Sequence, residues 1–407
     1  MKIKFLGGAE EVGRLGILLE SEDSKFQIDY GVIPEKPPMF PLPPEDIDGL
    51  FITHSHLDHI GAMPIYYQGG GVEVFATEMT ANTTRPMLND SVKVTALEGY
   101  VERFNRDDIE KMYTLMNIAQ YGRKIEYMES EITPYSAGHI PGSTMWKFVN
   151  SQELMVTGDL YTRDSKLLTG AKPQKAENLI VESTYAGKNH EDREEVRKRL
   201  RERVGEIVEH GGKVIIPSFA MGRLQELVMS LADLPYRIAT DGMGNLITSI
   251  YLNTPGYLRS EKEFRKAVGR IKEIRGRKMR ENIDNIDVII STSGMLDGGP
   301  VLSYIEKYVN DPKSAIFMTG YQAENTNGRS LMEKGTINIS GMEVKPEMQV
   351  EFFDMSAHAG HDDLVKFIKD CSPNNVILCH GENREALLED LANYNVILPY
   401  NGKEFTI

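Results

Sequence analysis

The stretch His54-Ser55-His56-Leu57-Asp58-His59 is the most informative part of this sequence, and it directly follows an apolar segment, residues 50–53, typical of a short strand. It places four potential metal ligands within six residues, where a strand gives way to a loop. Imidazole nitrogens and carboxylate oxygens suit zinc, which in catalytic sites keeps one position open for water. Ligands at this spacing can serve two adjacent metal ions from one turn. The alternative interpretation is a histidine-rich surface loop.

Further histidines follow predicted strands in the same way. The chain has nine histidines, and six of them lie in such segments: His54, His56, His59, His139, His358 and His380. Asp159 ends another apolar segment, residues 154–157, with one glycine between. A single histidine in such a place is more often a structural residue. Several at loop starts along one sheet edge are better explained by a shared metal site.

The spacing of apolar segments differs between the first third of the chain and the part after Glu191. Short strand-like runs dominate the first third, with helical spacing mainly between Met79 and Gln120. From Glu191 onward predicted helices and strands alternate, beginning with a charged helix over residues 191–210. Such alternation is typical of a parallel sheet flanked by helices. The sequence therefore predicts an α/β protein.

Composition excludes several classes of protein. The chain has 407 residues, room for two or three domains at roughly 150 residues each. Its 46 Lys and Arg against 60 Asp and Glu give a net charge of −14, which argues against a sequence-blind nucleic-acid coat. No apolar run is long enough to span a membrane, so we expect no membrane partner. Two cysteines exclude a disulfide scaffold, and a cytoplasmic location is the expectation.

Positive charge is concentrated in the middle of the chain. Residues 185–340 carry a net charge of +3, whereas the remainder carries −17. Within this part, residues 259–280 hold ten basic and three acidic residues. Beside a hydrolytic site, such a segment is the natural footprint of a polyanion, and we expect Arg275, Arg277 and Lys278 to contact phosphates. The alternative is a solvated helical face turned away from any substrate.

At the level of motifs the sequence resembles the metallo-β-lactamase-fold hydrolases of the β-CASP branch, the nucleases of RNA 3′-end processing and RNA decay. The turn at 54–59 is similar to the signature of the superfamily. Segments similar to the branch's own motifs are Val181-Glu182-Ser183-Thr184-Tyr185, Ser356-Ala357-His358-Ala359 and Cys379-His380-Gly381. Glu182 and Glu11-Val12-Gly13-Arg14 resemble the archaeal cleavage and polyadenylation specificity factor-like group without KH domains, since RNase J-type enzymes usually have Asp in place of Glu182. A departure from the group's pattern is residues 324–329.

The resemblance implies an architecture and its boundaries. An αββα metallo-β-lactamase sandwich would comprise residues 1–185 and 340–407, and a β-CASP domain, a parallel sheet flanked by helices, would be inserted at residues 186–339.

The resemblance also implies a metal site. One zinc ion would be held by His54, His56 and His139, and a second by Asp58, His59 and His380, with Asp159 bridging the two. Asp29 would orient the ligand histidines from behind, a common role for a carboxylate. The alternative for Asp29 is a turn-capping residue.

The implied activity is a zinc-dependent ribonuclease acting on single-stranded RNA, with Asp58, Glu182 and His358 as catalytic residues. Two ions activate a water and neutralise the phosphate. His358, held by Glu182, would be the general acid; metal binding or simple packing of His358 are the alternatives. The presence of His380 favours RNA, because DNA-acting members usually lack a histidine there.

Four further residues are candidates for phosphate binding, and each has a plainer structural alternative as a turn or cap residue: Arg223, Ser293, Gly294 and Ser356. Association as a homodimer or with other RNA-processing proteins is compatible with the sequence. Competing functions are a DNA-directed or other hydrolase of the same fold and a catalytically silent RNA-binding member. Endonuclease and 5′-to-3′ exonuclease activity are not separated.

Overall fold

The computed structural model describes residues 1–407 and divides them into two compact units. Unit 1 consists of Met1–Asp164, Thr169–Asn189 and His358–Ile407, and unit 2 of Ser165–Leu168 and His190–Ala357. Residues 340–357 therefore lie in unit 2, not in the metal-binding part where the resemblance placed them. The physical reason is strand pairing: Gln349–Phe352 (β19) runs parallel to Ala315–Met318 (β16) in the sheet of unit 2.

Unit 1 contains two sheets of seven strands each. The first has the order β22-β1-β2-β3-β4-β5-β6, formed by Glu404–Thr406, Lys2–Gly7, Gly16–Glu20, Lys25–Ile28, Gly49–Phe51, Glu73–Thr77 and Met116–Ala119. The second has the order β21-β20-β11-β10-β9-β8-β7, formed by Asn395–Ile397, Asn375–Cys379, Asn178–Glu182, Glu153–Val156, Thr144–Val149, Ser130–Ser136 and Ile125–Tyr127. Both chain ends thus contribute to the first sheet.

An aromatic core joins the two sheets of unit 1. Phe51 from the first sheet meets Trp146 and Phe148 from the second, with ring centroids 5.2 Å and 5.1 Å apart. Burying such large side chains contributes much of the stability of a sandwich. Because successive side chains of a strand point to opposite faces, Phe51 enters this core, while its neighbours Leu50 and Ile52 join the apolar cluster on the other face, with residues of the helices.

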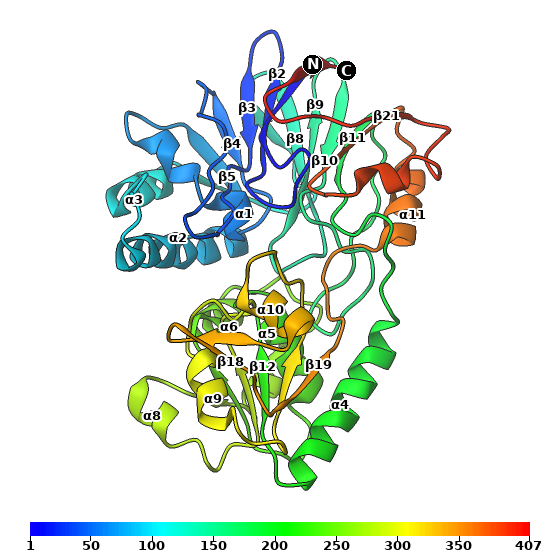
Figure 1. Cartoon of the computed structure of the whole chain (residues 1–407). Helices are drawn as coiled ribbons and strands as arrows, with labels where there is room; N and C mark the ends of the chain where they lie inside the picture. The colour runs from blue at the N-terminus through cyan, green and yellow to red at the C-terminus, as the bar shows by residue number, and fades with distance from the viewer. The chain divides into compact units, whose positions relative to one another are not determined.

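Helices cover the outer faces of both sheets (Figure 1). The first sheet carries α1 (Leu57–Ile60), η1 (Met63–Tyr67), α2 (Glu78–Glu98) and α3 (Arg106–Thr114). The second carries α11 (His361–Cys371) and η2 (Arg384–Leu387). Helix α2 is capped at its start by Thr77, whose side chain accepts the Thr80 N–H, and at its end by Gly99, which has the left-handed conformation. The αββα sandwich expected for this part is confirmed.

Unit 2 is built on a six-stranded sheet with the order β14-β13-β15-β12-β16-β19. Every pair in this sheet is parallel, and its remaining strands are Lys272–Glu273, Ile238–Asp241, Val288–Ser291 and Val214–Pro217. Its helices are α4 (Arg193–Glu209), α5 (Arg223–Leu231), α6 (Met243–Asn253), α7 (Glu261–Val268), α8 (Arg277–Glu281), α9 (Val301–Tyr308) and α10 (Asn327–Lys334). A hairpin, β17 (Ile337–Ile339) and β18 (Met342–Val344), follows α10.

Apolar clusters lie on both faces of the unit 2 sheet, one including residues of α4 and α5 and the other residues of α9 and α10. This arrangement confirms the α/β class and the helix predicted for residues 191–210. No helix of the chain combines the length and the apolar character that crossing a membrane requires.

Candidate metal centre

The turn at residues 54–59 is held tightly against the loop that follows β3. Tyr30 N–H donates to the His59 carbonyl at 2.7 Å and Val32 N–H to the Leu57 carbonyl at 2.9 Å. Between them stands Gly31, where an added Cβ would lie only 1.7 Å from the Asp58 carbonyl oxygen. Only glycine permits so close an approach of two backbones. The turn is therefore fixed by main-chain contacts before any ligand binds.

The remaining candidate ligands come from loops that follow other strands of unit 1. His139 follows β8, Asp159 follows β10 and His380 directly follows β20. These side chains are almost completely buried, with exposed fractions of 5%, 2% and 1%. Segments far apart in the sequence thus meet at one end of the sandwich.

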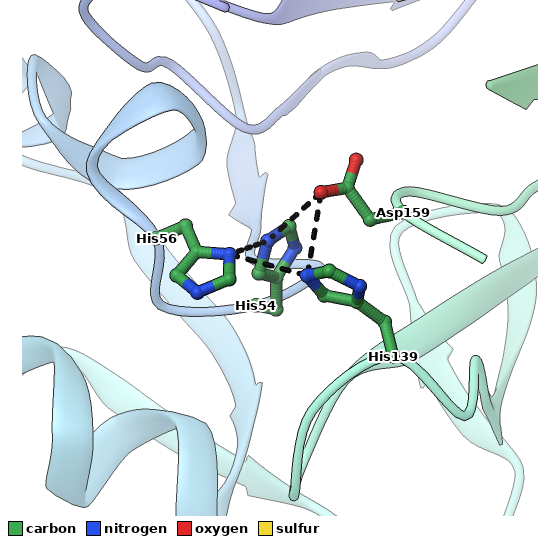
Figure 2. Close-up of side chains that lie close together, drawn as sticks. All are labelled: His54, His56, His139 and Asp159. Carbon is green, nitrogen blue, oxygen red and sulfur yellow. Dashed lines mark hydrogen bonds and ion pairs between the residues drawn. The ribbon is translucent and has the colours of Figure 1, made fainter. Parts of the chain in front are cut away.

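The first group of side chains contains His54, His56, His139 and Asp159 (Figure 2). Their ligand atoms all lie within 4.8 Å of one another. His56 Nδ1 lies 3.0 Å from His54 Nε2 and 3.2 Å from His139 Nε2. Asp159 Oδ2 lies 3.4 Å from His54 Nε2 and 3.5 Å from His139 Nε2. These atoms converge on one point from three loops.

The second group contains Asp58, His59 and His380. Asp58 Oδ2 lies 3.8 Å from His59 Nε2 and 3.7 Å from His380 Nε2. The other oxygen of Asp159, Oδ1, lies 3.2 Å from His59 Nε2 and 3.5 Å from His380 Nε2. Asp159 therefore presents one carboxylate oxygen to each group.

The chemistry of these donors fits a metal ion. His59 Nε2, His380 Nε2 and Asp159 Oδ1 are buried and make no hydrogen bond. Leaving buried atoms of this kind without a hydrogen bond costs free energy, about 1–3 kcal/mol for a neutral group. Neutral imidazole nitrogens and a carboxylate are ligands of zinc, so binding a metal ion would satisfy these atoms.

Asp29 lies behind the second group and is fully buried. Its Oδ1 accepts the Thr53 N–H at 2.8 Å, and its Oδ2 accepts the Thr53 hydroxyl at 2.5 Å. The same Oδ2 lies 2.7 Å from His59 Nδ1. Burial raises the pKa of Asp29, although His59 acts in the opposite direction. This contact directs the other ring nitrogen of His59, Nε2, toward the cluster.

Burial and neighbouring charges separate the pKa values of the histidines. Burial, followed by the nearby His59, holds the pKa of His54 well below its ordinary value. Burial acts in the same direction on His59, but the carboxylates of Asp159, Asp58 and Asp29 outweigh it and hold the His59 pKa well above its ordinary value. An uncharged His54 is the form that binds a metal ion.

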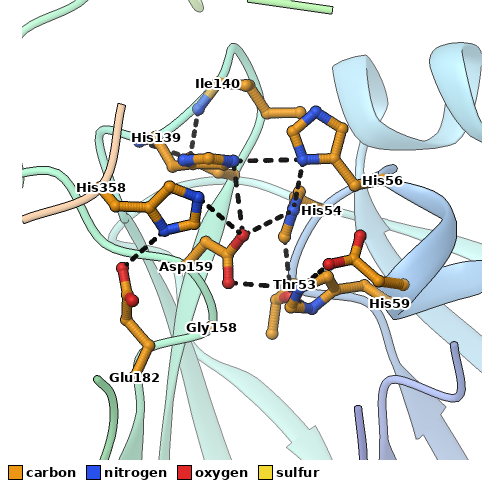
Figure 3. Close-up of polar contacts among 12 residues, drawn as sticks. Thr53, His54, His56, His59, His139, Ile140, Gly158, Asp159, Glu182 and His358 are labelled. Carbon is orange, nitrogen blue, oxygen red and sulfur yellow. Dashed lines mark hydrogen bonds and ion pairs between the residues drawn. The ribbon is translucent and has the colours of Figure 1, made fainter. Parts of the chain in front are cut away.

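His358 and Glu182 stand beside the first group (Figure 3). His358 Nδ1 lies 3.0 Å from Glu182 Oε1, and His358 Nε2 lies 3.8 Å from Asp159 Oδ2. Glu182 is fixed by the N–H groups of Leu160 and Thr184, each at 3.0 Å. Burial by itself would lower the pKa of His358, but the negative charges of Glu182 and Asp159 outweigh this effect and raise the pKa to about 9. The imidazole is therefore favoured in its protonated form.

The candidate phosphate-binding residues all belong to unit 2. The buried Arg223 guanidinium donates to the Thr319 carbonyl, and the Ser356 N–H donates to Asp354 Oδ1 at 3.1 Å. Ser293 and Gly294 follow β15, and a Cβ on Gly294 would lie 3.0 Å from the Phe219 nitrogen. These contacts favour structural roles for Arg223 and Ser356.

The basic residues 275–278 lie at the surface of unit 2, in and before α8. The side chains of Arg275 and Arg277 are 77% and 91% exposed. Each is paired with a glutamate of its own segment, Glu273 at 2.5 Å and Glu281 at 3.0 Å. Their exposure leaves them accessible to a polyanion.

Gly31 and Thr53 also support the site, although neither was expected from the sequence. Thr53 anchors Asp29, and its hydroxyl lies 3.2 Å from His54 Nδ1 and 3.3 Å from His59 Nδ1. The sequence offers only two signals for these roles. Thr53 directly precedes His54, and Gly31 follows Asp29 by two residues. Neither pattern by itself indicates a contact.

Comparisons with known proteins identify the family. Three family models match: a metallo-β-lactamase superfamily domain at residues 18–183, a Beta-Casp domain at 221–331, and a Zn-dependent metallo-hydrolase RNA specificity domain at 343–399. These descriptions agree with the His/Asp cluster in indicating a metal ion.

Three curated relatives are similar over all or nearly all of this chain. Probable RNase MJ4 of Methanocaldococcus jannaschii is 35% identical, over all of both chains. RNase aCSPSF2 of Saccharolobus solfataricus is also 35% identical, over all of this chain and 85% of that protein. Cleavage and polyadenylation specificity factor 73 of Drosophila melanogaster is 29% identical over 95% of this chain and 60% of that protein.

A solved structure shows the same fold at low identity. The crystal structure of a protein of unknown function from Enterococcus faecalis V583 has a TM-score of 0.62 at 14% identity, covering 100% of this chain and 99% of that one. Taken with the identity to full-length relatives and the geometry of the site, the comparisons show that the chain belongs to the metallo-β-lactamase-fold ribonucleases that carry a β-CASP domain.

Proposed function

We propose that this chain hydrolyses phosphodiester bonds of single-stranded RNA at a centre for two zinc ions, with His358 as general acid. The observation that carries the proposal is the position of Asp159, whose two oxygens face two separate groups of ligands while His358 lies beside it. His54, His56 and His139 would hold one ion, and Asp58, His59 and His380 the other, with Asp159 shared.

Two bound zinc ions would supply Lewis acidity, both for activating a water molecule and for neutralising the phosphate oxygens. The residues of the chain determine where this happens. Asp29 keeps His59 in place through its Nδ1 atom, and the main-chain contacts at Gly31 keep the turn in place. The phosphate to be cleaved would be held between the two groups, next to His358.

Protonated His358 would donate its Nε2 proton to the leaving ribose oxygen. Glu182 accepts from Nδ1 at 3.0 Å, so the other nitrogen faces the cluster. The Glu182 carboxylate is itself fixed by two backbone N–H groups and stabilises the positive charge of the imidazolium. As the proton leaves, the His358 ring becomes neutral and is ready to be reprotonated.

RNA is favoured over other substrates by the RNA specificity domain and by the relatives that are named RNases. Endonuclease and 5′-to-3′ exonuclease activity are both compatible with this site. Residues 275–278 and the turn at Ser293–Gly294 are proposed to contact the RNA backbone. A homodimer, a complex with other RNA-processing proteins and a cytoplasmic location stay predictions.

The decisive experiment compares one labelled sequence as single-stranded RNA and as DNA, with zinc-loaded and zinc-free protein. We expect zinc-dependent cleavage of RNA. Preferred cleavage of DNA would favour the DNA-directed alternative. Binding of RNA without cleavage would favour a catalytically silent, RNA-binding member of the family. The same assay with 5′-monophosphate, 5′-triphosphate and circular RNA separates endonuclease from 5′-to-3′ exonuclease activity, since only an endonuclease cuts a circular RNA.

A further inference from the structure

The second group of ligands is assembled from both sheets of unit 1. Asp58 and His59 follow β4 in the first sheet, whereas His380 follows β20 in the second. The first group is also assembled from both sheets, since His54 and His56 lie on the same turn as Asp58 and His59, while His139 and Asp159 follow β8 and β10 of the second sheet. What distinguishes the second group is a loop that contacts the backbones of Asp58 and His380.

The loop from Gly8 to Leu15, which connects β1 and β2, touches both sides of this group. The His380 N–H donates to the Gly8 carbonyl at 2.8 Å, and the Leu15 N–H donates to the Asp58 carbonyl at 2.8 Å. Near its end, the Gly13 nitrogen lies 3.5 Å from His380 Nδ1. The two ends of one loop thus hold the backbones of a ligand from each sheet.

Asn401, near the C-terminal end of the chain, binds the middle of this loop. Its Oδ1 accepts the Ala9 N–H at 3.0 Å, and its Nδ2 donates to Glu11 Oε1 at 3.0 Å. Its backbone N–H donates to Glu10 Oε2 at 3.4 Å. Glu11 also pairs with Arg14 at 2.7 Å. Three consecutive residues of the loop are therefore held by one asparagine.

The segment that carries Asn401 is in turn tied to the strand that presents His380. The guanidinium of Arg384, only 3% exposed, donates through Nη1 to the Leu378 carbonyl at 3.2 Å and to the Pro399 carbonyl at 2.8 Å. These contacts form a closed path. It runs from β20 through Arg384 to the segment of Asn401, and from Asn401 to the Gly8–Leu15 loop. The loop contacts Asp58, whose carboxylate lies 3.7 Å from His380 Nε2 at the end of β20.

We infer that Asn401, together with Glu11, is a positioning residue for the second metal site. Its side chain fixes the Gly8–Leu15 loop and so sets the separation of His380 from Asp58 and His59. This inference rests on the proposed two-ion centre. It also assigns a role to the Glu11-Val12-Gly13-Arg14 segment, whose residues lie outside both ligand groups.

The first test measures zinc bound per chain against a graded series of chelator concentrations. In the Asn401→Ala variant we expect the second ion to be bound about 10-fold more weakly, the lower end of the effect of losing a direct partner of a ligand, because Asn401 acts through the loop, while the first ion stays as in the wild type. The matched control is Asn395→Ala, which loses a 2.6 Å hydrogen bond to Asn375 at the opposite end of β20. That variant should keep both ions.

The second test exchanges the amide of Asn401 and the carboxylate of Glu11, which are hydrogen-bonded to each other. Asn401→Asp alone places two carboxylates together and should weaken the second ion at least as much as Asn401→Ala. Combining it with Glu11→Gln restores an amide beside a carboxylate and should recover part of the lost affinity. A general loss of stability would not be repaired by this exchange, so the melting temperature of the metal-free proteins is measured alongside.

The outcomes are distinct. Wild-type zinc binding by the Asn401→Ala variant, equal weakening of both ions, or no recovery in the double variant would overturn the inference. A wild-type protein that binds a single ion would instead overturn the two-ion centre on which it rests. A selective loss of the second ion that the double variant partly reverses is the expected result.

Discussion

His358 Nδ1 lies 3.0 Å from Glu182 Oε1, although 176 positions separate the two residues in the sequence. Glu182 is the last residue of β11, and its strand pairs in parallel with β20, which ends just before His380. Glu182 therefore lies at the same sheet edge as His380, and His358 Nε2 lies 3.8 Å from Asp159 Oδ2, the oxygen that faces the first ligand group. This placement allows one histidine to act on a phosphate without serving as a ligand.

Replacing His358 with Ala should lower the rate of RNA cleavage by about 10²–10⁴-fold, the usual contribution of a positioned proton donor. Zinc content and melting temperature should stay close to those of the wild type, because His358 belongs to neither ligand group. Single-turnover cleavage and elemental analysis on the same preparation check this. Loss of an ion in this variant would show that His358 is a ligand.

Replacing His56 or Asp159 with Ala should lower zinc content and activity together. Each substitution removes a donor from the first group, and that of Asp159 also removes a donor from the second. The matched control is His210→Ala, an exposed histidine of unit 2 that bonds its own helix. Wild-type protein that holds less than one ion per chain after careful loading would contradict the two-ion centre.

Replacing Gly31 with Ala should displace the turn that carries Asp58 and His59. The new Cβ would lie 1.7 Å from the Asp58 oxygen and 2.5 Å from the His59 nitrogen. Overpacking of this kind typically costs about 1–3 kcal/mol of stability, and zinc affinity should fall as well. Gly69→Ala, where no atom lies within 4 Å, is the control and should leave both thermal unfolding and zinc titration unchanged.

Replacing Arg275, Arg277 and Lys278 with Ala should weaken RNA binding and flatten its salt dependence. Each lost phosphate contact reduces the log–log slope by about 0.7 for a single strand. Cleavage of a small non-nucleotide phosphodiester should be unaffected, because these residues lie outside the ligand groups.

The control for this triple variant removes the same charge from unit 1, by changing Lys2, Lys124 and Lys366 to Ala. Their side chains are 51%, 66% and 75% exposed and each is ion-paired. Equal affinity and slope in wild type and both triple variants would identify residues 275–278 as a solvated face.

The sequence by itself determined the chemistry of the site and the class of fold. The ligands at 54–59 are neighbours in the sequence, so a strand followed by a short turn already predicts that they lie close together, although contacts with Tyr30 and Val32 hold the turn in place. The alternation of helices and strands after Glu191 likewise reports the parallel sheet of unit 2, because helical and extended periodicities are properties of neighbouring residues.

Only the tertiary structure decided where the units divide and how the loops at the site are supported. Residues 340–357 belong to unit 2 because β19 pairs with β16, and Ser165–Leu168 belongs there because Glu226 accepts the N–H groups of Lys166 and Leu167 at 3.1 Å and 2.9 Å. Asn401 reaches the Gly8–Leu15 loop across almost the whole length of the chain. Such contacts join residues that are far apart in the sequence, and the local sequence around one residue does not indicate its partner. The contacts therefore form only when the chain has folded.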